Sequence, residues 1–199
     1  MYLVGDVMYD SVVYNIKLAE KKSGIMSDLG LEPKTYALAT VHRAENTDNP
    51  ERLNAIFKAL DKIAREMMPV ILPLHPRTRK RAEEFGISPK QVCIIEPISY
   101  LDMLLLEKNA RVIITDSGGV QKEAFFLKVP CVTLREETEW VETVETEWNV
   151  LVGWDVERIL EAVRMAKPGR EESEPYGDGQ AAGRIVGILV DLWRVLHGG

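Results

Sequence analysis

The chain has 199 residues, of which 46% are hydrophobic and 28% are charged. This length allows one large domain with its own core, and the net charge of -6 argues against a general nucleic-acid or anionic-membrane surface. No apolar run approaches the roughly 18 residues that span a bilayer, and the start of the chain has no signal-peptide pattern. We therefore expect a cytoplasmic protein with neither a membrane nor a nucleic acid as partner.

Short apolar runs alternate with helical patterns along the chain. The clearest helical stripe runs from Leu53 to Met67, with Asn49 as N-cap and Pro50 as the first helical residue. Strand followed by helix, repeated, predicts an α/β fold with a doubly wound parallel sheet and helices on both faces. The runs that resemble strands buried on both faces are 35–41, 70–74, 92–95, 111–115, 130–134 and 149–152.

Further helices are predicted at 7–22 and 180–196, and a polar loop at 171–179. The two cysteines, Cys93 and Cys131, each lie within an apolar run. We expect both to be small core residues in a reducing compartment and not to form a disulfide.

The segment from Arg111 to Glu123 carries the most specific signal for a binding site. An apolar run ends, and Asp116-Ser-Gly-Gly119 then forms a small turn that opens directly onto a predicted helix. Free N–H groups of a first helical turn can bind a phosphate. Glu123 lies one turn further along, where its carboxylate could accept hydrogen bonds from two sugar hydroxyls. Phosphate and ribose together indicate a nucleotide, with an ordinary structural turn as the alternative.

Polar clusters also follow other predicted strands. His42-Arg-Ala-Glu-Asn46 follows the first strand, His75-Pro-Arg77 the second, and Arg135-Glu-Glu-Thr-Glu139 the fifth. The carboxyl ends of parallel strands meet at one edge of the sheet, where ligands bind in such folds. Arginine offers a planar fork to phosphate oxygens, and histidine can donate a hydrogen bond or carry charge. The clusters therefore favour a diphosphate at this edge.

A set of motifs in a fixed order identifies a family. The chain closely resembles non-hydrolysing UDP-N-acetylglucosamine 2-epimerases over nearly its whole length. The matching motifs are Thr40-Val-His-Arg-Ala-Glu-Asn46, His75-Pro76, Glu96-Pro97 with Tyr100, Thr115-Asp-Ser-Gly-Gly-Val-Gln-Lys-Glu123, Leu134-Arg-Glu-Glu-Thr-Glu139, Asn149-Val-Leu-Val-Gly153 and Pro175-Tyr-Gly-Asp-Gly-Gln-Ala181. The resemblance implies a GT-B architecture of two Rossmann-like domains, of which this chain matches the second.

The resemblance also implies the division of the chain and its partners. Residues 1–23 would link from a first domain, 24–179 would form the UDP-binding domain, and 180–199 would cross back to the first domain. The first domain would be supplied in cis or in trans, and a homo-oligomer is expected. The implied ligand is a UDP-sugar, and no cofactor or metal is implied.

Individual residues acquire roles from the same resemblance. Ser117, Gly118 and Gly119 correspond to diphosphate-binding residues, and Glu123 to the residue that binds the ribose hydroxyls. The other implied positions are His42 as the active-site histidine beside the phosphates, Met103 near uracil, Arg135 lining the cleft, and Arg43, Glu45 and His75 at a possible second, activating substrate site.

The implied reaction interconverts UDP-N-acetylglucosamine and UDP-N-acetylmannosamine. UDP is eliminated to leave 2-acetamidoglucal, and it is then added back with C2 inverted; the carboxylates that handle the C2 proton belong to the first domain. Two alternatives stay open: a nucleotide-sugar-binding module without catalysis, and half of a GT-B glycosyltransferase. The His-Arg-x-Glu-Asn run weakens the second, because glycosyltransferases do not generally share it.

This chain departs from the family pattern after Glu139, where many members continue Arg-Pro-Glu. Here Trp140-Val-Glu142 follows, which predicts that the loop contacts a different sugar. The helices at the two ends are expected to expose apolar residues and to promote self-association. These residues are Val7, Val12, Val13, Ile16, Ile188, Leu192 and Leu196.

Overall fold

A single parallel sheet organises the structure, a computed structural model that describes residues 1–170 and 175–197. Its strands are β1 (Ala37–Thr40), β2 (Val70–Pro73), β3 (Cys93–Ile95), β4 (Val112–Thr115), β5 (Cys131–Thr133) and β6 (Asn149–Leu151). They pair in the order β3-β2-β1-β4-β5-β6, and every pairing is parallel. The predicted doubly wound α/β fold is therefore confirmed, and each strand falls inside one of the predicted runs.

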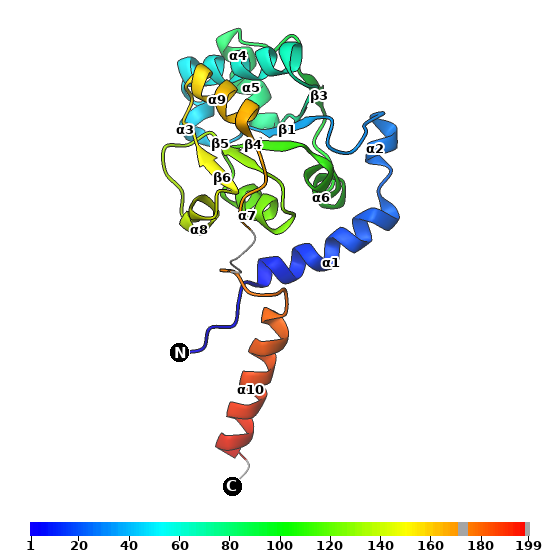
Figure 1. Cartoon of the computed structure of the whole chain (residues 1–199), viewed down its shortest axis with the longest axis vertical. Coiled ribbons are helices and arrows are strands. Elements are labelled where there is room, and N and C mark those ends of the chain that lie inside the picture. Colours follow the sequence, from blue (N-terminus) through cyan, green and yellow to red (C-terminus); the bar gives the residue numbers. More distant parts are fainter. Residues whose placement is uncertain (171–174, 198–199) are drawn as a thin grey trace.

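Helices cover both faces of this sheet (Figure 1). They are α1 (Val7–Lys22), α2 (Ile25–Asp28), α3 (Ala44–Thr47), α4 (Pro50–Glu66), α5 (Pro76–Phe85), α6 (Tyr100–Asn109), α7 (Gly118–Phe126), α8 (Val141–Glu145), α9 (Val156–Met165) and α10 (Ala181–His197). The start of α4 is as predicted, since the Asn49 side chain accepts hydrogen bonds from the first-turn N–H groups and Pro50 is the first residue.

Alternate residues of the strands fill two separate cores. Ala37 and Ala39 of β1 face the core that includes α4 and α9, whereas Leu38 faces the core that includes α6 and α7. Both faces are covered, so the strands are continuous apolar runs, as expected for a parallel sheet. Cys131 is buried, as predicted. The prediction for Cys93 is wrong: this residue is exposed, because it begins β3, a short strand at one edge of the sheet.

The order in which strands join the sheet reverses once, and the reversal point in space lies between the neighbouring strands β1 and β4. From β1 the sheet grows to β2 and β3 on one side, and β4 then starts the other side. Thr40 and Thr115, the last residues of β1 and β4, are register partners, and their hydroxyl oxygens lie 2.6 Å apart. The connections that leave these two strands diverge to opposite faces, which opens a crevice at the carboxyl ends. The candidate site lies there.

The two terminal helices differ in how much of them is covered. α1 packs along α6 and α7, and Val12 is only 1% exposed. The expectation that Val12 would lack partners is therefore wrong, because this half of the protein itself covers α1. By contrast, α10 extends away from the sheet (Figure 1). Its exposed apolar residues are Val186, Leu189, Val190, Leu192, Trp193, Val195 and Leu196.

The helix predicted at 180–196 is present as α10, whereas part of the predicted polar loop, 171–174, lies outside the described residues. In residues 1–170 and 175–197, none of the helices combines the length and the apolar character needed to cross a membrane.

Candidate functional site

Asp116 joins the loops that emerge from β1 and β4. Its side chain is fully buried and accepts hydrogen bonds from the backbone N–H groups of His42 and Arg43, at 3.1–3.2 Å, and from the Asn46 amide at 3.1 Å. The same Asn46 amide donates to the Leu134 carbonyl after β5. One carboxylate and one amide thus tie together the carboxyl ends of three neighbouring strands. Asp116 therefore determines where His42 lies.

The Ser-Gly-Gly turn forms the first turn of α7, as predicted. Ser117 is the N-cap, and its hydroxyl accepts a hydrogen bond from the Val120 N–H at 3.4 Å. The Ser117 N–H donates in turn to the Thr115 hydroxyl at 2.9 Å. The N–H groups of Gly118 and Gly119 belong to the first turn, where α-helix geometry supplies no intrahelical acceptor. This end of α7 consequently has the form of an anion site.

Arg135, which follows β5, lies close to the same turn. Its side chain is buried to 7% exposure, and its guanidinium donates to both carboxylate oxygens of Glu139 at 2.8 and 3.0 Å. Arg43 Nη1 approaches the same carboxylate at 4.0 Å. Hydrogen bonds from Arg135 hold the pKa of Glu139 down at about 2, so this carboxylate is charged at neutral pH. Two arginines therefore lie beside the charged Glu139 carboxylate.

A pocket of about 230 Å³ opens beside this turn. The residues that line it come from the carboxyl ends of β1 and β2, from the loop after β3 and from α6 and α7; they are Thr40, Val41, His42, Pro73, His75, Pro97, Ile98, Met103 and Val120. The predicted residues His42, His75 and Met103 are thus brought together. The His42 Nδ1 atom lies 3.6 Å from an Asp116 oxygen, and the side chain of His42 is 42% exposed.

Glu123 is more buried than a surface carboxylate would be, with 7% exposure. Burial raises its pKa, whereas its hydrogen bond with the Tyr100 hydroxyl acts in the opposite direction. Its neighbour Glu107 on α6 is fully buried, and neither Glu107 oxygen has a hydrogen-bond partner among the described residues. Burial and the adjacent Glu123 charge raise the pKa of Glu107 well above its usual value. A carboxyl group that is buried without donors is more stable neutral than charged, so Glu107 favours its protonated form more than an exposed glutamate does.

Several predicted residues also have partners within the protein itself. His75 is the N-cap of α5, and its Nδ1 accepts a hydrogen bond from the Arg77 N–H at 3.2 Å. Glu45 forms an ion pair with Arg52 at 2.8 Å, and Arg77 pairs with Asp48 at 2.7 Å. These exposed pairs are of the kind that contributes little to stability.

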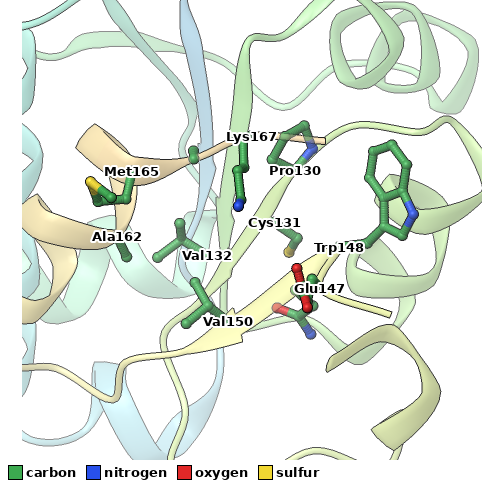
Figure 2. Close-up of a pocket in the computed structure, with 11 residues that line it drawn as sticks. Pro130, Cys131, Val132, Glu147, Trp148, Val150, Ala162, Met165 and Lys167 are labelled. Carbon is green, nitrogen blue, oxygen red and sulfur yellow. The ribbon is translucent and has the colours of Figure 1, made fainter. Parts of the chain in front are cut away.

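A second pocket, of about 170 Å³, lies at the opposite end of the strands (Figure 2). Pro130 and Trp148, directly before β5 and β6, line it together with the end of α9. Figure 2 shows Trp148 on one side and Met165 on the other. Ligands of parallel sheets bind at the carboxyl ends of strands. This pocket is at the amino ends and is therefore separate from the candidate site.

Two residues of the site were not singled out by sequence reasoning. Asp116 was assigned only to the turn, although its carboxylate connects three strands. Glu107 lies near the end of α6, outside the motif Glu96-Pro97 with Tyr100 that sequence reasoning used. The available signal was the apolar run Leu104-Leu-Leu106 directly before it, but that run did not show that the Glu107 side chain is buried.

The fold and the site at the carboxyl ends of its strands define a class of protein. It is a doubly wound α/β domain with a helix end suited to an anion between β1 and β4, where the strand order reverses. Residues 1–190 match the family model described as UDP-N-acetylglucosamine 2-epimerase. The chain belongs to the UDP-N-acetylglucosamine 2-epimerase family, and its fold is that of a Rossmann-like half of the GT-B-like architecture of these proteins.

Individual relatives support this placement. A UDP-N-acetylglucosamine 2-epimerase homolog of Methanococcus maripaludis is 48% identical, over 96% of this chain and 55% of the relative. A UDP-2,3-diacetamido-2,3-dideoxy-D-glucuronate 2-epimerase of Pseudomonas aeruginosa is 46% identical, over 95% of this chain and 52% of the relative. The chain thus spans about half the length of these curated relatives.

A solved structure supports both the family assignment and the match to about half of a relative. The UDP-GlcNAc 2-epimerase of Methanocaldococcus jannaschii, in complex with UDP-GlcNAc and UDP, has a TM-score of 0.85 and 44% identity. The match covers 95% of this chain and 54% of that one. The similarity therefore extends over nearly all of this chain and about half of the relative.

We expect Asp116→Asn to lower the free energy of unfolding by about 2–3 kcal/mol, because the amide leaves some buried donors without an acceptor. Urea unfolding followed by circular dichroism measures this change. Asp191→Asn, on the exposed surface of α10, is the control and should stay within about 0.5 kcal/mol of the unchanged protein. An unfolding midpoint for Asp116→Asn equal to that of the control would contradict the role assigned to Asp116.

The Glu107–Glu123 pair should make stability depend on pH. Above the ordinary carboxyl pKa the unfolded chain loses the Glu107 proton more readily than the folded protein does, since burial raises the folded pKa of Glu107. The free energy of unfolding attributable to Glu107 should therefore decline as the pH rises from 5 to 8. The expected size is about 1.4 kcal/mol per unit by which the folded pKa exceeds the unfolded one.

Glu107→Gln keeps the neutral form at every pH and should flatten this decline. Urea unfolding of both proteins at intervals from pH 5 to pH 8 measures the difference. Glu161→Gln, an exposed substitution on α9, should leave the pH profile unchanged. Parallel profiles for Glu107→Gln and the unchanged protein would show that Glu107 ionises normally.

Proposed function

We propose that this chain is the UDP-binding half of a UDP-N-acetylglucosamine 2-epimerase. The observation that carries the proposal is the convergence of the first turn of α7, the buried Arg135 and His42 at one crevice. These groups are hydrogen-bond donors that a diphosphate requires. The family and the ligand-bound relative of M. jannaschii support the same ligand class.

The proposed chemistry begins with the departure of UDP from C1 of the sugar. Negative charge then develops on the diphosphate, and fixed donors around it stabilise that charge more than they stabilise the bound substrate. Gly118 and Gly119 supply backbone N–H groups, and Arg135 supplies a guanidinium. His42 is proposed as the histidine beside the phosphates, because Asp116 holds its backbone and approaches its ring.

The remaining roles follow from position in the crevice. Met103 lines the pocket in which we propose that uracil binds, and Glu123 is the proposed acceptor for the ribose hydroxyls. A second, activating nucleotide-sugar would use Arg43, Glu45 and His75, of which His75 lines the same pocket. Its volume of about 230 Å³ is below the roughly 300–1,000 Å³ of complete ligand sites, which supports a site that another part of the protein completes.

The base for the C2 proton is assigned to the other half of the epimerase. A base must lie within hydrogen-bonding reach of the proton that it removes, and the acidic groups of this crevice lie beside the phosphate donors instead. Isomerase activity is accordingly proposed for the complete two-half protein, with the first half supplied in cis or in trans. A nucleotide-sugar-binding module without catalysis is the second candidate, since all the groups proposed to bind UDP lie in this half.

The names of the relatives indicate the class of sugar that we propose. One relative is named for UDP-N-acetylglucosamine and another for a diacetamido glucuronate sugar. The proposed substrate is therefore a UDP-linked 2-acetamido sugar, with UDP-N-acetylglucosamine as the first to be tested. Trp140, in the loop after β5, is proposed to contribute to the choice among such sugars.

UDP should bind this chain weakly, with a dissociation constant near the millimolar range, and UMP should bind more weakly still. Glu123→Gln should weaken UDP binding by about 1–3 kcal/mol, because hydrogen bonds to a charged acceptor are lost. Isothermal titration calorimetry measures both effects. Glu161→Gln, which removes a charge far from the crevice on α9, should bind UDP like the unchanged protein. Absence of UDP binding at several millimolar would refute the proposed site.

The apolar face of α10 is proposed to lie in a protein contact, either with the first half or with a second copy. An exposed apolar patch of this kind usually becomes covered by association. In the absence of a first half we expect a dimer or larger assembly in analytical ultracentrifugation. Leu192→Glu with Leu196→Glu should shift it towards monomer, whereas Arg184→Glu, near the start of α10, should not. A monodisperse monomer for the unchanged chain would contradict self-association.

A further inference from the structure

The corner between α7 and the loop after β5 contains more buried donors than acceptors. Arg135 is 7% exposed, and its Nε has no hydrogen-bond partner among the described residues. The indole Nε1 of Trp140 is also buried and has no partner there. Buried donors in folded proteins are nearly always paired. Together with the first-turn N–H groups of α7, this corner is suited to an acceptor with several oxygens.

One acidic side chain already reaches into this corner. The Glu139 carboxylate accepts two hydrogen bonds from Arg135, at 2.8 and 3.0 Å. A Cβ atom placed on Gly118 would lie 3.8 Å from Glu139 Oε2 and 3.3 Å from Trp140 Nε1. The carboxylate therefore lies against the helix end where we propose that the diphosphate binds.

The two buried donors of the corner, Arg135 and Trp140, are held in place by the surrounding protein. The Glu139 side chain is not enclosed in this way. The Trp140 ring is stacked beneath the Lys122 ammonium, 4.1 Å from the ring centroid, and Lys122 is ion-paired with Asp6. Arg135 is enclosed by the protein. The Glu139 side chain is 55% exposed, in contrast to 7% for Arg135, so it can rotate into solvent without disturbing the core.

We propose that Glu139 is an internal anion that occupies the phosphate position of the ligand-free protein, and that a diphosphate displaces it from Arg135 and α7. This inference rests on the proposed function and adds a determinant of specificity to it. A diphosphate replaces the negative charge that leaves Arg135. A neutral nucleoside cannot do so, and it leaves the Arg135–Glu139 pair in place.

The test compares Glu139→Gln with the unchanged protein. The substitution keeps the size of the side chain and removes the charge that UDP must displace. The dissociation constant of UDP should fall about 3- to 5-fold, which is the upper range for an exposed ion pair. That of uridine, which lacks phosphates, should stay the same. Glu137→Gln, an exposed substitution in the same loop, is the matched control and should leave UDP affinity unchanged.

Inorganic pyrophosphate separates this inference from the proposed function, because it probes the corner without a nucleoside. Calorimetry should show tighter pyrophosphate binding to Glu139→Gln than to the unchanged protein. Loss of UDP binding in the unchanged protein, with this pyrophosphate difference intact, would reject the proposed function alone. Equal or weaker binding of UDP and pyrophosphate to Glu139→Gln would overturn the inference, since Glu139 would then support Arg135 and not compete with the ligand.

Discussion

The candidate site depends on one buried carboxylate. Asp116 follows β4, and it accepts hydrogen bonds from the loop after β1 and from Asn46, which also contacts the end of β5. A buried charge without donors would be strongly unfavourable, so these loops can close only when their N–H groups converge on it. That convergence places His42 and the first turn of α7 at the same crevice.

Burial separates the fixed parts of the site from its adjustable part. Arg135, Glu107 and Asp116 are enclosed by the protein, whereas Glu139 and His42 are exposed to solvent. Enclosed groups lose little orientation when a ligand arrives, which is the condition for efficient charge stabilisation. The exposed groups, by contrast, can reorient. The candidate site thus combines enclosed groups, among them the donor Arg135, with an exposed acidic side chain, Glu139.

Much of the fold could be predicted from the sequence because its signals are local. The six strands are short apolar runs, and α4 has its cap, proline and apolar stripe within one segment. Strand and helix alternation predicts the parallel sheet, and a parallel sheet brings the ends of its strands to one edge. The clusters containing His42, His75 and Arg135 could therefore be assigned to that edge before any coordinates were known.

The sequence by itself thus determined the elements, the sheet type and the residues that share an edge, since spacing and residue type specify these locally. Only the tertiary structure decided which groups meet. Asp116 contacts residues about 70 positions earlier in the chain, Glu107 becomes buried beside Glu123 from another helix, and α1 covers α6. The ion pair of Glu139 with Arg135 lies beside the first turn of α7, which belongs to a different segment of the chain. Contacts between distant segments depend on how helices and strands pack, and no local pattern encodes that packing.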